Sequence, residues 1–480
     1  MPFADFREFL QALRDHGELV DIDRPVALKF EVGKAMRKSA STQGPALLFK
    51  QNGTAFPLVG GVYNSRAKAL IALESSEDKV FQRVLEGLER RIKPVHVDKA
   101  PVHQNVVEGD KVDLAKIPVP KYSPDDGGPY ITAGIVVSRD PQTGVPDIGH
   151  YRFEVIDGQT LTFCPMANHR LGKHVAKARA MGLKTYRAAI LIGVDPLIAY
   201  ACPIQVPDST DDFEVAGGLR GAPIELVKAH TVDLDVPARA EFVIEFEVDL
   251  TRQVMEGPLG EFTGFYTPPA LQPPSRITAI THRDDAVFQA LLTGVPPSEN
   301  HILKQLPYEA SFLAQMRRQF PTVEKVAIPS SGGVAFRVVF AMKPRFAGEA
   351  RAALLAAMTS NIRPKVVIAV DPDIDVHDPV QVDWATSFRM QPARDLVVVD
   401  AMPVGTLDPS SDRTQPQDHR TGSTVGIDAT FPYGSIVRTP GPKSVCAPAL
   451  SEHGLEYFEV ADVPGWREYE LPELKRRAGS

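Results

Sequence analysis

Residues 240–248 read Ala-Glu-Phe-Val-Ile-Glu-Phe-Glu-Val, a run in which aromatic and β-branched side chains dominate. A run of this length and composition, without glycine or proline, is typical of a β-strand that packs on a core. Other short apolar runs, separated by turn residues, stand on both sides of it at residues 131–137, 151–155, 188–194 and 276–281. Many short strands at regular intervals indicate a barrel-like or sandwich-like β domain.

The segments that flank this β region combine helical and strand patterns. The predicted helices lie at residues 3–13, 78–88, 307–320, 347–359 and 380–389, and the predicted strands at 19–22, 46–49, 334–341 and 365–370. Alternation of this kind is typical of layered α/β domains. The sequence therefore predicts an α/β (α+β) multidomain protein with an N-terminal α/β domain (1–115), a central β domain (116–300) and a C-terminal α/β domain (301–480). Residues 406–438 read as an irregular tail, and residues 470–477 as a terminal helix.

The composition restricts the function classes. The 480 residues carry 53 basic and 60 acidic side chains, a net charge of −7, which argues against a broad nucleic-acid-binding surface. Cys164, Cys202 and Cys446 form no CxxC or paired framework, as expected in a reducing compartment. No apolar run approaches the roughly 20 residues that cross a bilayer. We therefore expect a cytoplasmic protein with no nucleic-acid partner and no membrane span.

The most informative motif is Met-Glu-Gly-Pro-Leu-Gly-Glu-Phe-Thr-Gly-Phe-Tyr at residues 255–266. Because Gly257, Pro258 and Gly260 preclude a regular helix, a loop can turn Glu256 and Glu261 towards one cavity. Converging carboxyl groups suit proton transfer, since repulsion and burial raise the pKa of at least one of them. The alternative is a surface turn with two solvated glutamates.

Two other segments carry candidate ligands. Asp147 and Arg152 lie in Asp-Ile-Gly-His-Tyr-Arg-Phe at residues 147–153, with His169 downstream, and a glycine-rich turn at residues 217–221 leads Glu225 into a predicted short helix. An Asp, a His and a Glu can form a site for Mn²⁺ or Mg²⁺, but such a scattered trio is more often structural. Glycines beside an arginine can cradle a phosphate or only form a turn.

Together these segments resemble the UbiD family of decarboxylases, which use prenylated FMN to remove carbon dioxide reversibly from aromatic and α,β-unsaturated acids. The resemblance extends over nearly the whole chain. Besides residues 255–266, it rests on Leu-Arg-Gly-Ala-Pro-Ile-Glu-Leu-Val-Lys at 219–228, Asp-Pro-Asp-Ile-Asp at 371–375, Arg-Met-Gln-Pro-Ala-Arg-Asp at 389–395 and Gly-Ile-Asp-Ala-Thr at 426–430. It implies that the central domain is a split β-barrel that binds the flavin.

The resemblance also implies roles for individual residues. The implied catalytic residues are Arg152, Glu256 and Glu261; the implied cofactor-binding residues are Tyr151, Arg152, His169, Arg220 and Glu225; and the implied metal ligands are Asp147, His169 and Glu225. The implied cofactors are prenylated FMN, Mn²⁺ and K⁺. The chain departs from the family at Asp147, where an Asn ligand is usual, and at Thr424, where relatives often carry Lys.

The chemistry needs such a cofactor, because loss of carbon dioxide from an sp² carbon leaves a carbanion that no ordinary side chain can delocalise. On this interpretation Glu261 protonates that carbon, Arg152 orients the substrate and Glu256 fixes Arg152. The implied partners are a small carboxylic acid, free or as a larger aryl-CoA or polyprenylated hydroxybenzoate derivative, a flavin prenyltransferase that makes the cofactor, and further copies of the chain in a homodimer or homohexamer. The alternatives are a flavin-reductase-like oxidoreductase that uses FMN and a nicotinamide donor, and a non-enzymatic flavin or metal binder.

Overall fold

The computed structural model describes residues 2–166, 169–415 and 420–434. Its contacts separate residues 1–430 from residues 431–480, and all elements described below belong to the first unit. The predicted terminal helix at residues 470–477 lies outside the described residues.

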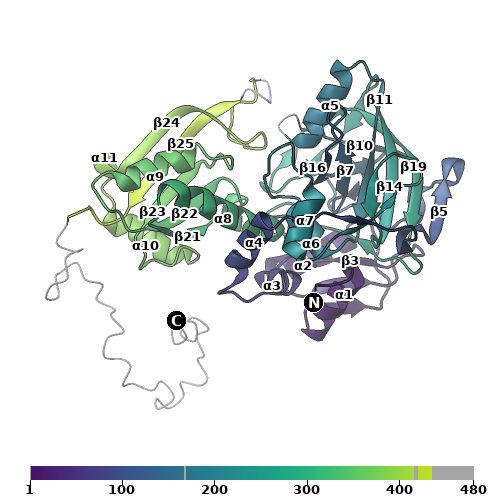
Figure 1. Ribbon diagram of the computed structural model, residues 1–480, viewed down its shortest axis with the longest axis horizontal. Helices are drawn as coiled ribbons and strands as arrows, with labels where there is room; N and C mark the ends of the chain where they lie inside the picture. Colours follow the sequence, from purple (N-terminus) through teal and green to yellow (C-terminus); the bar gives the residue numbers. More distant parts are fainter. Residues whose placement is uncertain (1, 167–168, 416–419, 435–480) are drawn as a thin grey trace, which may run out of the picture. The chain divides into compact units, whose positions relative to one another are not determined.

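The N-terminal segment is a small α/β unit, drawn in purple in Figure 1. Its elements are α1 (Phe6–Asp15), β1 (Leu19–Ile22), α2 (Glu31–Ser41), β2 (Ala46–Phe49), β3 (Leu58–Gly60), α3 (Arg66–Ala72) and α4 (Val80–Glu89). α1 begins after Asp5, whose carboxylate accepts hydrogen bonds from the backbone N–H groups of Arg7 and Glu8 and so satisfies the open helix end. The strands order as β1-β2-β3-β20, where β20 (Phe288–Gln289) returns from far along the chain.

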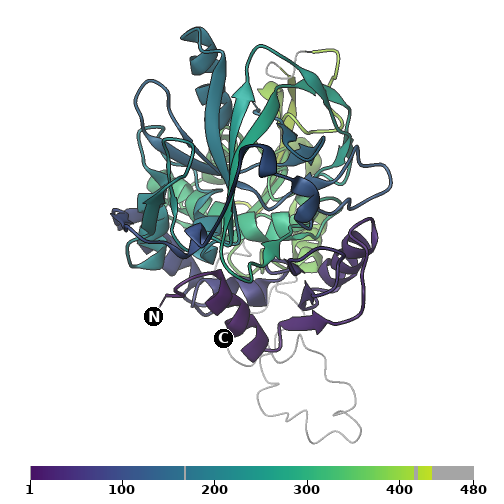
Figure 2. The same ribbon diagram turned by 90° about the vertical axis from the view of Figure 1, so that its right-hand side faces the viewer.

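A curled half-barrel sheet forms the central part, and among the described residues it has nine strands. Its strands are β5 (Asn105–Glu108), β6 (Tyr130–Ile131), β7 (Ile135–Arg139), β8 (Pro146–His150), β9 (Phe153–Val155), β10 (Thr160–Phe163), β11 (Thr185–Ile192), β14 (Phe242–Asp249) and β19 (Pro274–His282). The order is β6-β9-β10-β19-β14-β11-β7-β8, with β5 paired to β19. Figure 2 shows the curvature of these strands. The predicted split-barrel β domain is confirmed.

Helices and short hairpins surround this sheet. The helices are α5 (Arg170–Ala180), α6 (Pro196–Ala201) and α7 (Asp212–Arg220). The short strands are β4 (Val95–His96), β12 (Glu225–Lys228), β13 (Asp235–Pro237), β15 (Val254–Glu256), β16 (Leu259–Gly260), β17 (Tyr266–Thr267) and β18 (Ala270–Gln272). Glu225 is therefore the first residue of a strand that pairs with β13 and β4, and the short helix predicted there is wrong.

The C-terminal segment is a second α/β layer, drawn in green and yellow in Figure 1. Its elements are α8 (Glu299–Gln319), β21 (Val323–Ala327), β22 (Arg337–Met342), α9 (Glu349–Met358), β23 (Val366–Val370), α10 (Pro379–Arg389), α11 (Pro392–Asp395), β24 (Leu396–Pro403) and β25 (Thr421–Ala429). The sheet order is β21-β22-β23-β25-β24. β25 lies inside the segment predicted as an irregular tail, which corrects that prediction.

α8 links two hydrophobic clusters. It begins after Ser298, well before the predicted start, and passes through Pro307. Leu303 and Leu306 are buried in a cluster with α1 and α6, whereas Phe312 and Leu313 are buried among β22 and α9. Because both halves pack on cores, the helix continues through a proline that removes one hydrogen-bond donor. Within the described ranges, no helix is long and apolar enough to span a membrane.

Candidate active site

Arg152 connects the two glutamates of the 255–266 motif. Arg152 lies in the connection between β8 and β9, Glu256 is the last residue of β15, and Glu261 directly follows β16. Arg152 Nε donates to Glu256 Oε1 at 3.1 Å and Nη2 to Glu256 Oε2 at 3.3 Å, and Nη1 donates to Glu261 Oε1. Because the side chains of Glu256, Glu261 and Arg152 are only 1%, 13% and 16% exposed, this is a largely buried ion-pair chain and not a pair of solvated surface glutamates.

The loop between the glutamates is held by its backbone. Gly257 has a φ of 93°, a conformation that favours glycine, and its N–H donates to Glu154 Oε2 at 2.7 Å. Further along, the Gly127 N–H donates to the Pro258 carbonyl at 2.7 Å. After Gly260, the N–H of Glu261 donates to the Phe265 carbonyl at 3.0 Å, which closes a tight turn. The loop therefore presents both carboxyl groups to one guanidinium.

Tyr130 and Glu154 also belong to this network, although the sequence did not single them out. The Tyr130 hydroxyl lies 3.2 Å from Glu154 Oε2 and 3.2 Å from Glu256 Oε1, as donor to both. Burial raises the pKa of Glu154, and the hydrogen bonds from Gly257 and Tyr130 counteract that rise. The sequence could have indicated Glu154 by its position two residues after Arg152, because alternate residues of an extended chain point to the same side.

Asp147 faces an arginine. Its Oδ1 lies 3.1 Å from Arg170 Nε, and Arg170 Nη1 lies 2.8 Å from both carboxylate oxygens of Asp212. Burial raises the pKa of Asp147, and burial raises that of Asp212 to about 7. Arg170 thus pairs with two buried carboxyl groups. Neither Arg170 nor Asp212 was predicted, and the only signals in the sequence were the position of Arg170 beside His169 and of Asp212 at the start of the segment that leads to Arg220.

The predicted metal ligands Asp147, His169 and Glu225 form no cluster among the described residues, and their role as a ligand set stays a prediction. Glu225 Oε2 accepts a hydrogen bond from Arg239 Nε at 2.8 Å on the surface. Across the described ranges, no group of three or more His, Cys, Asp or Glu side chains has a geometry that could hold a metal ion. The side chains as placed therefore do not fit Mn²⁺, because the β-strand at Glu225 directs its carboxylate to Arg239.

The side chains of Arg220 and Thr424 both hydrogen-bond to other groups of the protein. Arg220 donates to Asp195 Oδ2 at 2.8 Å and to the carbonyls of Pro223 and Phe3 at 3.0 Å each, so it braces the chain around α7. The predicted role of Arg220 in cofactor binding gains no support from these contacts. The Thr424 hydroxyl, buried in β25, donates to the Pro364 carbonyl at 3.1 Å.

Tyr151 and His169 lie side by side. Their ring centroids are 6.1 Å apart with the planes at 64°. His169 is the N-cap residue of α5, and its side chain makes no capping hydrogen bond. The backbone N–H groups at a helix N-terminus favour a phosphate. This donor set fits the phosphate end of a flavin mononucleotide.

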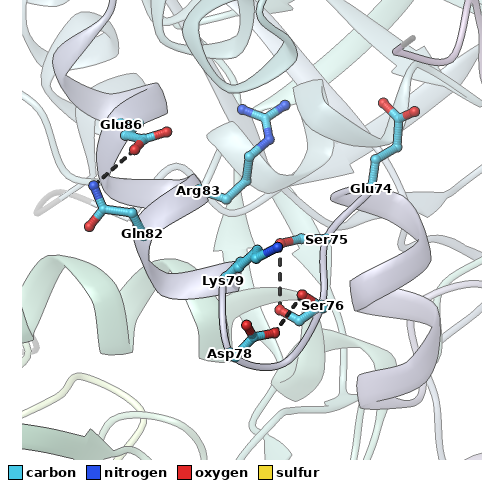
Figure 3. A pocket seen from close by; sticks show the side chains of 8 residues that line it. All are labelled: Glu74, Ser75, Ser76, Asp78, Lys79, Gln82, Arg83 and Glu86. Atoms are coloured by element: carbon cyan, nitrogen blue, oxygen red, sulfur yellow. Dashed lines mark hydrogen bonds between the residues drawn. The ribbon is translucent and has the colours of Figure 1, made fainter.

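A surface recess of about 690 Å³ lies elsewhere, along the loop before α4 and the first turns of that helix. Figure 3 shows its lining residues, among them Glu74, Lys79 and Arg83. All of them come from one short stretch of chain, and none belongs to the Arg152 network. It is therefore not the candidate active site.

Comparison with known proteins identifies the family. Residues 10–88, 93–296 and 301–429 match, in order, the N-terminal, Rift-related and C-terminal domain models of 3-octaprenyl-4-hydroxybenzoate carboxy-lyase, which are the UbiD family models. The solved UbiD-class enzyme HmfF from Pelotomaculum thermopropionicum, in complex with FMN, is 31% identical, with a TM-score of 0.86 over 95% of this chain and 99% of that chain. The chain belongs to the UbiD family.

Two more structures of UbiD relatives extend the comparison. An evolved dimeric form of HmfF from Pelotomaculum thermopropionicum, in complex with prFMN, is 29% identical, with a TM-score of 0.82 over 96% of this chain and 100% of that chain. Vanillic acid decarboxylase from Sedimentibacter hydroxybenzoicus is 27% identical, with a TM-score of 0.83 over 95% of this chain and 98% of that chain. UbiD members are carboxy-lyases, and the alternative of a flavin-reductase-like oxidoreductase finds no support in these matches.

Proposed function

We propose that this protein catalyses the reversible, non-oxidative decarboxylation of an aromatic, heteroaromatic or α,β-unsaturated carboxylic acid with prenylated FMN. The observation that carries the proposal is the buried Glu256–Arg152–Glu261 chain. It lies in a UbiD chain whose relatives include an enzyme solved with prFMN and a vanillic acid decarboxylase. Bound prenylated FMN supplies the electron sink that decarboxylation at an sp² carbon requires.

Each member of the chain then has a defined task. Glu261, near the surface end of the network, holds the proton that replaces the departing carboxylate at the substrate carbon. Arg152 keeps Glu261 in place through Nη1 and presents its guanidinium to the substrate. Glu256 holds Arg152 in place by accepting two hydrogen bonds from it, and the Tyr130 hydroxyl donates a hydrogen bond to Glu256. Tyr151 and His169 would hold the flavin phosphate at the start of α5.

The other expectations remain predictions. Mn²⁺ and K⁺ follow from the family resemblance alone, and no catalytic step is assigned to them, since Arg170 occupies the position between Asp147 and Asp212. A flavin prenyltransferase as cofactor supplier and assembly into a homodimer or homohexamer are predicted on the same basis. A cytoplasmic location is predicted from the cysteine content and from the shortness of the apolar runs. The relative solved as an evolved dimeric form is consistent with such assembly.

The test is to produce the protein together with a flavin prenyltransferase. The bound cofactor is identified by mass and absorbance, and aromatic, heteroaromatic and unsaturated acids are screened for release of carbon dioxide. The proposal expects a prenylated flavin and carbon dioxide from at least one class of acid. Unmodified FMN together with reduction by a nicotinamide would contradict it.

A further inference from the structure

Lys304 is a cation on α8 beside the loop that carries Glu261. Its Nζ lies 5.2 Å from the centroid of the Phe262 ring, and Phe262 directly follows Glu261. The contact is a cation–π interaction, which holds the ammonium over the ring of the residue that follows Glu261 in the chain.

Phe262 is a fixed platform for this ammonium. Its ring stacks on Phe336 at 6.3 Å with the planes at 13°, and it meets the His301 ring at 6.4 Å and 65°. His301 Nε2 lies 2.6 Å from the Phe262 carbonyl, while His301 Nδ1 lies 2.7 Å from the Ser298 hydroxyl. The bond to the Phe262 carbonyl ties the start of α8 to the loop, so the position of Lys304 relative to Phe262 is fixed as well.

No carboxylate compensates Lys304 in the described part of the chain. Burial lowers its pKa to about 8, and no acidic group lies close enough to raise it. The titratable groups whose pKa the charge of Lys304 lowers are His150, His169 and His301. Burial lowers the pKa of His150 to about 3 and that of His301 to about 4, so both rings are neutral near pH 7.

Partial burial of an ammonium without a counter-ion raises the free energy of the folded protein, because the charge loses hydration. An oxyanion that binds to the ammonium offsets much of this desolvation penalty. We propose that Lys304 is the receptor for an anionic oxygen group, a carboxylate or a phosphate, that a ligand brings to the face of Phe262 beside Glu261. This inference rests on the proposed function and makes it more specific. It assigns the preferred substrate to acids that carry a second anionic group in addition to the carboxylate that leaves.

The same chemistry has two possible sources, the second acidic group of the substrate and the phosphate of the flavin. We take the substrate as the first source, because Lys304 contacts Phe262, the residue next to Glu261. The charge of Lys304 also lowers the pKa of His169 at the start of α5, so the phosphate is tested as the second source. Binding measurements on protein loaded with unmodified FMN separate the two sources without requiring turnover.

The experiment compares the wild type with Lys304→Met, Lys304→Arg and the matched control Lys343→Met, which changes an exposed lysine. Calorimetry gives the affinity of an aromatic dicarboxylate and of the matching monocarboxylate for the FMN-loaded protein. We expect the wild type and Lys304→Arg to bind the diacid at least tenfold more tightly, and Lys304→Met to lose that preference with unchanged monoacid affinity. Lys343→Met keeps the wild-type preference.

A second arm measures binding of FMN and of riboflavin to the apoprotein. If Lys304→Met binds FMN tenfold more weakly than the wild type but binds riboflavin equally well, the anion that Lys304 receives is the flavin phosphate. This result supports Lys304 as an anion receptor, with the cofactor and not the substrate as the source of the anion. The inference is overturned if Lys304→Met changes neither the diacid preference nor the difference between FMN and riboflavin. Because neither arm measures carbon dioxide, a protein that binds the diacid without decarboxylating any acid refutes the proposed function alone.

Discussion

Tyr130→Phe tests whether the hydroxyl behind the glutamates controls the protonation of the site. The substitution removes one O–H that lies 3.2 Å from both Glu154 and Glu256 and leaves the rest of the buried ring in place. A hydrogen bond to a charged group contributes about 1.5–3 kcal/mol. Its loss therefore raises the pKa of Glu154, because this hydrogen bond counteracts the rise that burial causes. At about 1.36 kcal/mol per pH unit, the free energy of the bond corresponds to a displacement of a pH profile by about 1–2 units.

This change reaches activity through the loop. Ionised Glu154 accepts the Gly257 N–H at 2.7 Å, and Gly257 follows directly after Glu256. When Glu154 takes up a proton, that bond weakens and the loop that positions Glu256 and Glu261 loosens. The acid limb of the profile of kcat/KM against pH therefore moves to higher pH in Tyr130→Phe by about 1–2 units.

The assay is the initial rate of carbon dioxide release from pH 4.5 to 9 with the holoenzyme, together with thermal unfolding at each pH. Tyr122→Phe is the matched control, because the hydroxyl of this buried tyrosine bonds to Thr132 at 2.7 Å and not to a carboxylate. Both variants lower Tm, whereas only Tyr130→Phe moves the acid limb. Superimposable pH profiles for the wild type and Tyr130→Phe would refute the reasoning.

Two further predictions concern groups outside this network. Glu225→Gln removes only an exposed ion pair with Arg239, which contributes about 0–1 kcal/mol to stability. We expect the metal content of this variant, measured by mass spectrometry, to equal that of the wild type. Loss of a bound metal in the variant would show that Glu225 is a metal ligand. Burial raises the pKa of Glu309 from 4.5 to about 7, so the folded state binds its proton more tightly and wild-type stability falls as pH rises between these values. Glu309→Gln keeps the acceptor for Ile328, so its free energy of unfolding should fall less between pH 5 and pH 8 than that of the wild type, by an amount on the order of 3 kcal/mol. Denaturant unfolding at both pH values measures this difference, and an equal fall would contradict this reading.

The sequence was most informative where a local pattern and the packing agree. The apolar runs around residues 188–194 and 240–248 became β11 and β14, neighbours in the curled sheet, because strands buried on a core need a continuous supply of apolar side chains. Arg152, Glu256 and Glu261 also came together as predicted from the family motifs. Their loop is governed by glycine and proline at fixed positions, and such local constraints are visible in a sequence.

The sequence failed where tertiary contacts decide. Pro307 resembled a helix start, but Ser298 begins α8 because residues on both sides of the proline are buried. β25 was not predicted, because it lies in a segment rich in polar residues and its register is set by pairing with β23 and β24. Glu225 begins a strand and not the predicted short helix, because of a pairing between β12 and β13 that no spacing reveals. Arg170 and Asp212, which surround Asp147, meet only in three dimensions.

The most direct test of the account is Glu261→Gln in the holoenzyme. The amide keeps the shape of the side chain but removes the proton that Glu261 is proposed to deliver, and a general acid contributes about 10²–10⁴-fold to rate. We expect the release of carbon dioxide to fall at least about 100-fold, while the content of bound prenylated flavin equals that of the wild type. A Glu261→Gln enzyme that binds the flavin and decarboxylates at the wild-type rate would contradict the central claim.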